Sequence, residues 1–293
     1  MVGMRGWWQD LTDLVLPAEC GGCGRPRTVL CPECRDALSG AVPRRVRPVP
    51  EPWGLPVVYA AAPYADEVRA VLLAHKERGA LPLARPLGVA LAGAVRAGLS
   101  GFSLDGPLLL VPVPSGRGAV RARGHDPARR IALAAAAELR RTGTSARVLA
   151  VLRQRRPVAD QAGLDARQRL ENLAGALSVA AGGAGLLRAG PVVLVDDLMT
   201  TGASLTEAAR AIRVALAEET AGYGGAAFAT RGDVVTAVYV GVNGERTGER
   251  MRGSMEGSTD REGAVPGKAN SACDVIRAAV IAAPPDSFEI NRN

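Results

Sequence analysis

The stretch "GPVVLVDDLMTTGASLTEAARAI" (residues 190–212) decides the fold. Its apolar start predicts a buried strand of a parallel sheet over 191–195, and the spacing of apolar residues after the glycine predicts a helix over 203–218. Two adjacent aspartates and a Thr-Thr-Gly turn lie between them. Because ligands bind beyond the carboxyl ends of the strands in an open α/β sheet, we expect a ligand site at this turn.

The turn has the chemistry of a phosphate site. The first turn of a helix has free N–H groups and a positive dipole end, and Thr200, Thr201 and Ser204 add hydroxyl donors. Asp196 and Asp197 would repel a phosphate unless they bind other groups, and vicinal ribose hydroxyls are suitable donors to them. In the simpler alternative the hydroxyls only cap the helix, but a cap needs one such residue and leaves both aspartates unexplained. The stretch therefore predicts a site for ribose 5-phosphate.

Around this stretch, segments that resemble strands alternate with segments that resemble helices. Such alternation predicts an α/β fold with a mostly parallel sheet flanked by helices. The predicted helices are 64–77, 82–98, 127–141, 165–172 and 203–218; the predicted strands are 57–62, 107–114, 147–152, 174–179 and 191–195, with two short ones at 225–230 and 233–240.

Four of the five cysteines lie in "CGGCGRPRTVLCPEC", as Cys20, Cys23, Cys31 and Cys34. Each Cys-x-x-Cys pair can turn two thiolates toward one ion, and two such pairs make a tetrahedral site typical of structural Zn²⁺. Iron would also fit four thiolates. The alternatives are two disulfides or a redox pair, whereas Cys273, far from the others, is expected to be an incidental thiol. The segment is too small for a core of its own, so the ion would supply much of its folding energy.

The composition limits the kind of core and the kind of binding partner that we expect. Hydrophobic residues make up 47% of the 293 residues but aromatic residues only 3%, so the core must consist of Ala, Val and Leu. The net charge of +7 favours an acidic or phosphorylated partner, and residues 117–156 hold eleven arginines. This segment is either a solvated basic face or an anion-binding one. The start of the chain has no secretion signal and no apolar run is long enough to cross a membrane, so we expect a cytoplasmic protein without membrane insertion.

The chain divides into four parts. We predict a zinc knuckle at 12–40, a proline- and arginine-rich linker at 41–56, the α/β domain at 57–240 and a disordered tail at 241–293, in which 274–283 is a short helix at most.

The motif "VVLVDDLMTTGAS" resembles the 5-phosphoribosyl-1-pyrophosphate (PRPP) loop of type I phosphoribosyltransferases, specifically of the ComF (competence protein F) family. The resemblance covers roughly residues 12 to 240. It includes the cysteine knuckle, a lysine in "VRAVLLAHKERG", the segment "VPVPSGRGAVRARGHDPARR" and the segment "RQRRPVADQAGLDARQRLENLAGAL". It implies the type I phosphoribosyltransferase fold with a small N-terminal Cys₄ zinc segment.

The resemblance also implies a role for individual residues. Asp196 and Asp197 would be the catalytic carboxylates that hold the ribose hydroxyls of PRPP, with Mg²⁺ bound alongside it. The implied 5-phosphate loop is Met199, Thr200, Thr201, Gly202, Ala203 and Ser204; the implied pyrophosphate contacts are Ser115, Gly116, Arg117, Arg153 and Arg169; the further matched residues are Lys76, Arg123, Gly124, Gln161 and Asn172.

The chain departs from the family pattern at several positions. Where the family has Arg-Gly-Phe-Asn-Gln, this chain has His125, Asp126 and Pro127 after the Arg-Gly pair. Asp126 and Pro127 make a good helix start, and a lone histidine before a helix is more often structural than catalytic. Val158 and Leu177 replace an expected threonine and phenylalanine. These departures bear on the acceptor that the site takes.

Three functions remain open. The first is an enzyme that transfers phosphoribosyl to an unknown acceptor. The second is a DNA-uptake accessory protein that binds single-stranded DNA through its arginines, although few aromatic residues are present to stack bases: Trp7, Trp8 and Trp53 are the tryptophans. The third is a sensor that binds PRPP without consuming it. No Walker-type P-loop is present, so the chain is not expected to be an ATP-driven motor.

Overall fold

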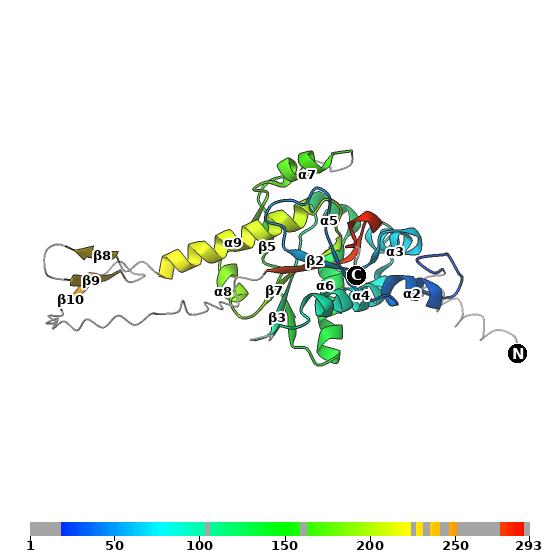
Figure 1. The fold of residues 1–293 in the computed structure, drawn as a ribbon, viewed down its shortest axis with the longest axis horizontal. Coiled ribbons are helices and arrows are strands. Elements are labelled where there is room, and N and C mark those ends of the chain that lie inside the picture. Colours follow the sequence, from blue (N-terminus) through cyan, green and yellow to red (C-terminus); the bar gives the residue numbers. More distant parts are fainter. Residues whose placement is uncertain are drawn as a thin grey trace, which may run out of the picture.

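The computed structural model describes residues 19–102, 106–158, 163–223, 227–230, 235–240, 246–250 and 276–289. Its main sheet has six strands in the order β1-β2-β11-β7-β3-β4, and all neighbours are parallel except β1 and β2 (Figure 1). The strands are β1 (Arg44–Val46), β2 (Val57–Pro63), β3 (Leu108–Pro112), β4 (Ala146–Val148), β7 (Val192–Leu198) and β11 (Arg277–Ala283). This is the mostly parallel α/β sheet that the sequence predicts.

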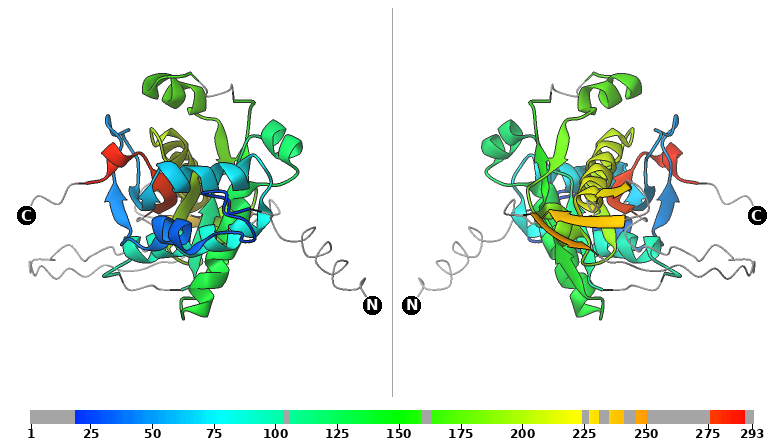
Figure 2. Two further views of the ribbon diagram at one scale, coloured as in Figure 1. Left: turned by 90° about the vertical axis from the view of Figure 1, so that its right-hand side faces the viewer. Right: turned by 90° about the vertical axis from the view of Figure 1, so that its left-hand side faces the viewer.

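Helices cover both faces of this sheet (Figure 2). On one face α4 (Ala84–Gly98) and α6 (Pro127–Arg141) pack together, joined by α2 (Pro32–Ser39), α3 (Asp66–Lys76) and the 3₁₀ turn η1 (Leu81–Leu83). On the other face lies α9 (Ala203–Tyr223), with α8 (Gly183–Leu187) beside it. The remaining elements are α5 (Arg117–Arg123), α7 (Ala166–Leu173), the antiparallel pair β5 (Leu152–Gln154) and β6 (Leu177–Val179), and the 3₁₀ turn η3 (Pro285–Ser287).

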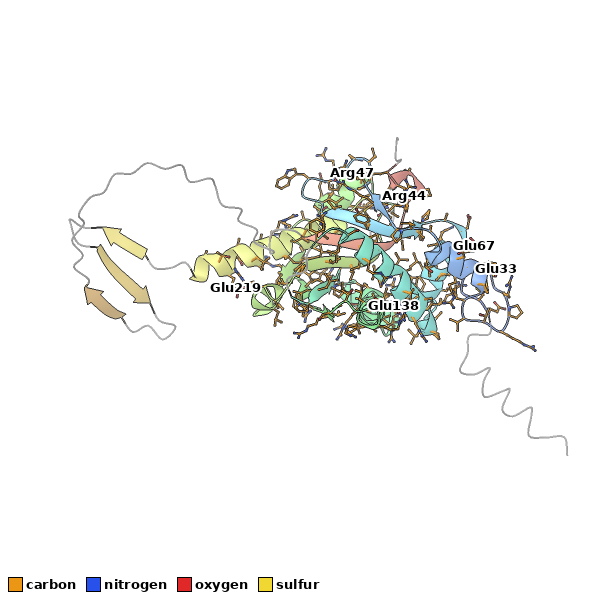
Figure 3. The ribbon with its side chains drawn as sticks, turned by 60° about the horizontal axis from the view of Figure 1, so that its bottom comes forward. Glu33, Arg44, Arg47, Glu67, Glu138 and Glu219 are labelled. Atoms are coloured by element: carbon orange, nitrogen blue, oxygen red, sulfur yellow. The ribbon has the colours of Figure 1, made fainter. Side chains whose placement is uncertain are left out.

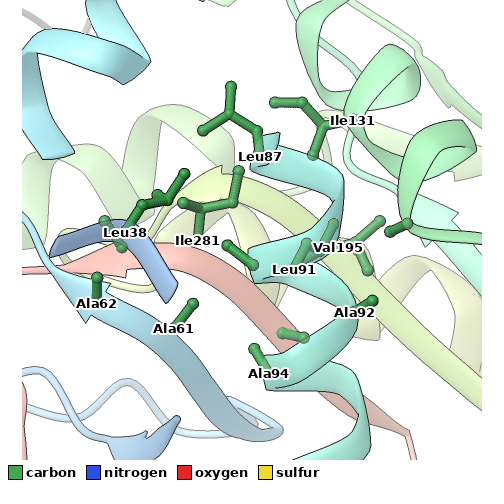
Figure 4. Close-up of a cluster of buried hydrophobic side chains, with 14 of the residues drawn as sticks. Leu38, Ala61, Ala62, Leu87, Leu91, Ala92, Ala94, Ile131, Val195 and Ile281 are labelled. Carbon is green, nitrogen blue, oxygen red and sulfur yellow. The ribbon is translucent and has the colours of Figure 1, made fainter. Parts of the chain in front are cut away.

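The core is built from small and branched aliphatic side chains, as the composition predicts. Leu87, Leu91 and Ile131 from the helices meet Val195 and Ile281 from the sheet (Figure 4). The alanines let the helices approach closely: a Cβ on Gly88 of α4 would lie 2.5 Å from the Cβ of Ala134 on α6. Leu38 of α2 is fully buried in the same cluster, so the cysteine segment shares its core with the sheet.

The largest error in the prediction concerns the segment 241–293. It was expected to be disordered and at most a short helix, yet residues 277–283 form β11, which pairs with both β2 and β7. The run "RAAVIAA" misleads because alanine favours helices and is depleted in strands, while here it fills a narrow space between two other strands. The folded domain therefore extends to at least residue 289, and residues 251–275 lie outside the described part.

Two smaller predictions also need correction. The predicted linker 41–56 contains β1, which pairs antiparallel with β2. Figure 3 labels Arg44 and Arg47 in this segment; Arg44 donates to the backbone carbonyl of Glu289, and Arg47 forms an ion pair with the Glu289 side chain. The single predicted strand 147–152 is split, because β4 joins the main sheet whereas β5 leaves it to pair with β6.

The strands predicted at 225–230 and 233–240 are present, but they form a separate sheet. β8 (Ala227–Thr230), β9 (Val235–Val240) and β10 (Arg246–Arg250) pair antiparallel in the order β10-β9-β8. None of the helices within the described ranges is both long and apolar enough to cross a membrane.

Candidate functional site

The candidate site begins at the carboxyl end of β7. The strand continues through Asp196 and Asp197 to Leu198, three residues beyond its predicted end, because β11 pairs alongside it as far as Leu198. Successive side chains of a strand leave opposite faces, so the two carboxylates do not lie in parallel as a simple pair. Asp197 is 7% exposed, and the Oδ1 of Asp196 accepts the N–H of Asp197 at 2.8 Å.

A lysine from another element neutralises this end of the strand. The Nζ of Lys76, at the end of α3, lies 2.8 Å from Oδ2 of Asp197. Burial disfavours the charged form of Lys76, but the negative charge of Asp197, its hydrogen bond and the charge of Asp196 raise the pKa of the lysine. Burial and the charge of Asp197 raise the pKa of Asp196 well above its ordinary value, and Lys76 opposes this rise. The three groups therefore act as one electrostatic unit.

The turn after β7 is fixed by contacts of Met199 at its start and by the backbone conformation of Gly202 at its end. Met199 is buried in the core beside α9, and its N–H donates to the carbonyl of Ala282 at 3.0 Å, so this amide is not available to a ligand. Gly202 has a φ of 75°, a conformation that suits glycine, and an added Cβ there would lie 3.0 Å from Leu55. Because α9 begins at Ala203, the N–H groups of its first turn have no partner within the helix.

An arginine from α7 reaches the same turn. The Nη1 of Arg169 lies 3.5 Å from Oγ1 of Thr200, at the outer limit of a hydrogen bond, and Thr200 is exposed. The start of α7 is fixed by a capping box between Asp165 and Gln168, in which each side chain accepts from the other residue's backbone N–H. Thr201 and Ser204 are partly exposed. The turn thus combines hydroxyls, free amides and one guanidinium.

The predicted pyrophosphate turn lies at the same edge of the sheet. β3 is the neighbour of β7, and the N–H of Val113 donates to the carbonyl of Val195 at 3.0 Å. Ser115 and Gly116 follow, and Gly116 is the N-cap of α5, so the predicted turn leads into a short helix. Arg117 is the first residue of that helix, and its side chain lies outside the described part.

The other residues implied by the resemblance are not all brought to this edge. The Nη1 of Arg153 donates to the carbonyls of Ala150 at 2.6 Å and Leu152 at 3.0 Å, so this guanidinium is engaged near its own strand. Asn172 lies on α7, where its carbonyl accepts from Arg156. Gln161 lies outside the described residues.

Contacts at the end of α3 were missed by the sequence analysis. The rings of His75 and His125 meet edge to face with centroids 5.6 Å apart, and Glu77 forms a bidentate ion pair with Arg123 at 2.7 and 3.0 Å. Gly124 ends α5 with a φ of 72° and directs the chain toward His125. The two histidines are the only ones in the chain, and that scarcity was the one available signal.

The four cysteines lie together as predicted, with their Sγ atoms all within 4.8 Å of one another. They are free thiols, which excludes the two disulfides considered from the sequence. The N–H of Cys31 donates to Sγ of Cys20 at 3.3 Å, and Cys31 also caps α2 by accepting from the N–H of Cys34. Four converging sulfurs, of which those of Cys20 and Cys31 accept backbone N–H groups, fit a tetrahedral thiolate-bound ion such as Zn²⁺.

The protein environment shifts the pKa values of Cys20 and Cys34 in opposite directions. Burial opposes the ionisation of Cys20, but backbone N–H donors, chiefly that of Cys31, lower its pKa to about 6. Burial and the hydrogen bonds that the Cys34 S–H makes to neighbouring sulfurs raise the pKa of Cys34. The cluster also packs tightly, because a Cβ on Gly22 would lie 2.6 Å from Sγ of Cys34 and 3.4 Å from Val71 on α3.

A scan against protein-family models gives no match to this chain, and a search of curated proteins gives none either.

Proposed function

We propose that the chain binds PRPP at the carboxyl end of β7 as a phosphoribosyltransferase-type protein of the ComF kind, and that it transfers the phosphoribosyl group to an acceptor. One observation carries the proposal: two carboxylates and a helix start with several hydroxyl groups adjoin at the carboxyl edge of a parallel sheet. That edge is where ligands of open α/β sheets bind. The Cys₄ cluster, with Zn²⁺ as the ion, is a structural part of the proposal.

Each group has a separate task in this proposal. Asp196 and Asp197 accept hydrogen bonds from the ribose hydroxyls. The free amides at the start of α9 and the hydroxyls of Thr200, Thr201 and Ser204 bind the 5-phosphate, where the positive end of the helix dipole also favours an anion. Arg169 reaches the turn from α7 and is suited to bidentate contact with the pyrophosphate.

The transfer breaks the bond between the anomeric carbon and the pyrophosphate oxygen, and positive charge develops on the ribose ring. Carboxylates beside the ring stabilise this charge, and cations beside the leaving group stabilise the pyrophosphate. Mg²⁺ enters with PRPP as part of the substrate. An acceptor nucleophile then forms the new bond to the anomeric carbon, while water must be kept away because it would hydrolyse PRPP.

Isothermal calorimetry of PRPP in the presence of Mg²⁺ tests the proposal. We expect the Asp196→Asn/Asp197→Asn double variant to bind at least tenfold more weakly than the unaltered protein, because each lost hydrogen bond to a charged group costs about 1.5–3 kcal/mol. Asp36→Asn, on the exposed face of α2, removes one charge far along the chain from β7 and should bind as the unaltered protein does. Equal binding by the double variant would contradict the proposal.

The same samples separate an enzyme from a sensor. An enzyme supplied with its acceptor consumes PRPP and releases pyrophosphate, which a coupled pyrophosphate assay detects against a panel of nucleobases and amines. Binding without release for every acceptor would favour a PRPP sensor.

We do not propose single-stranded DNA as a second ligand. Part of the basic segment 117–156 has partners within the chain. Five of its arginines donate to a carboxylate or carbonyl of the protein itself: Arg123, Arg140, Arg141, Arg153 and Arg156. DNA binding remains a prediction that a steep loss of affinity with salt would test.

A further inference from the structure

The last turn of α3 connects three parts of the molecule through three consecutive residues. His75 meets His125 at the start of α6, Lys76 meets Asp197 at the end of β7, and Glu77 meets Arg123 at the end of α5. Glu77 is exposed, but His75 is only 1% exposed. Because these three contacts fix the end of α3, Lys76 is held in one position relative to the carboxylates.

Lys76 supplies the charge that the two aspartates need. In the part of the chain that the structure describes, its ammonium is the cation that forms an ion pair with either aspartate. Burial and the charge of Asp197 both favour a proton on Asp196, and the charge of Lys76 acts against that proton. The other charged or titratable groups near α3 are weaker influences: Arg123 repels Lys76, and His75 lies next to it in a largely uncharged state because burial lowers its pKa.

The protonation of the aspartates matters for the ligand. An ionised carboxylate offers only acceptor sites, whereas a protonated one presents an O–H donor in place of an acceptor. A vicinal diol donates two O–H groups and therefore needs acceptors. A proton on Asp196 would remove part of what the diol binds.

Lys76 can also donate hydrogen bonds in addition to its ion pair with Asp197. Its ammonium carries three N–H donors, one of which suffices for Asp197, and its side chain keeps 34% of its surface exposed. Lys76 can therefore neutralise Asp197 without closing the site, since a carboxylate has acceptor sites to spare.

We propose that Lys76 is a positioning residue that orients Asp197 and keeps Asp196 ionised, so that both carboxylates accept the hydroxyls of a vicinal diol. This inference rests on the proposed function for the identity of the ligand, but the state of the carboxylates can be measured without any ligand. The two can therefore fail separately.

The first measurement is a pH titration of the ligand-free protein by ¹³C NMR of labelled aspartate carboxyls, assigned with Asp196→Asn and Asp197→Asn. We expect Lys76→Met to move the titration of Asp196 to higher pH, because the cation that opposes its protonation is gone. Lys76→Arg keeps the charge and should titrate nearly as the unaltered protein does. Arg78→Met removes a cation of similar length two residues further on, where it is exposed, and should change nothing.

The second measurement is calorimetric binding of PRPP by the same variants between pH 6 and 8.5. At pH 7 we expect Lys76→Met to bind at least tenfold more weakly and to recover part of that loss as the pH rises and Asp196 loses its proton. A purely structural lysine would lower binding equally at every pH. Thermal midpoints and metal content of each variant show that the fold is retained, and the Lys76→Arg variant serves as rescue.

The outcomes are distinct. An unchanged carboxyl titration in Lys76→Met overturns the inference, whether or not PRPP binds. A shifted titration, with no PRPP binding by the unaltered protein, supports the role of Lys76 and overturns the proposed function instead. A shifted titration together with pH-dependent loss of binding supports both.

Discussion

The Cys₄ cluster and the aspartate pair both hold like charges close together, yet the protein balances them differently. Asp197 is balanced by Lys76, a cation that the chain itself provides. The four sulfurs converge within 4.8 Å, and the groups that hydrogen-bond to them include backbone N–H groups, other thiols and the carboxyl group of Glu33. In the proposed function the carboxylates bind an exchangeable ligand, whereas the four sulfurs could hold a metal ion as a permanent part of the fold.

The two sites share one helix. Val71 of α3 lies against the cysteine segment, and Lys76 lies five residues later, about 7.5 Å further along the helix axis. An ion that orders the cysteine segment therefore also fixes the helix that presents the lysine. Three predictions test how far the two sites differ.

Loss of the metal should have the largest effect. In Cys20→Ser we expect bound metal to fall from about one ion per chain to near zero, and the thermal midpoint to fall with it, since structural zinc supplies on the order of 10 kcal/mol in small zinc domains. Elemental analysis by mass spectrometry and scanning calorimetry measure the two quantities. Cys273→Ser is the matched control and should keep its metal. Full metal content in Cys20→Ser would contradict the assigned ligand set.

Two glycines allow the sites to be compared by the same substitution. In Gly22→Ala the new Cβ would lie 2.6 Å from Sγ of Cys34, which cannot move without leaving its partners, so we expect a cost of about 1–3 kcal/mol and weaker metal binding. In Gly202→Ala the neighbour is the flexible side chain of Leu55, and the main cost is the left-handed backbone, about 1–2 kcal/mol.

Chemical denaturation and a metal-competition assay measure these effects. Gly79→Ala is the control for Gly202→Ala, because Gly79 has a φ of 67° and nothing within 4 Å of an added Cβ. Metal affinity should change in Gly22→Ala alone. An equal loss of metal affinity in Gly202→Ala would show that the two sites are more tightly coupled than the shared helix implies.

The smallest effect concerns the pH dependence of stability at the lysine end of α3. Burial lowers the pKa of His75 in the folded state, so its contribution to stability is fully present above the unfolded value of about 6.5 and is lost as the pH falls through the lower folded value. We expect denaturation midpoints of His75→Gln to depend less on pH between 7.5 and 5 than those of the unaltered protein. An identical pH dependence would show that His75 does not titrate on unfolding in this range.

The elements near the ligand site were predictable because their signals are local. An apolar run followed by aspartates marks β7, the turn chemistry marks the start of α9, and two Cys-x-x-Cys pairs mark the metal cluster. Lys76 was assigned only through the resemblance, since no local pattern connects residue 76 with Asp197.

The remaining features depend on long-range packing. β11 consists largely of alanine, and only its two neighbouring strands make an extended conformation favourable. The contact of His75 with His125 joins residues fifty positions apart and follows no periodicity. Arg153 was assigned to the pyrophosphate by its place in the sequence, whereas its guanidinium binds carbonyls nearby, which no sequence pattern reveals.

Because β11 is central in the sheet but late in the sequence, it affects how the protein folds during synthesis. Without β11 the sheet consists of two separate parts, β1-β2 and β7-β3-β4, with the edges of β2 and β7 unpaired. At 5–20 residues per second, a ribosome needs roughly 4 to 17 seconds to proceed from the end of β7 to the end of β11.

During that interval the nascent chain exposes two unpaired strand edges, which can pair with strands of other chains. The turn that carries Met199 is also incomplete during this interval, because the N–H of Met199 donates to the carbonyl of Ala282, which is synthesised later. The candidate site is thus completed among the last steps of synthesis, and a chain interrupted before residue 276 carries the motif of that site without the sheet that holds it.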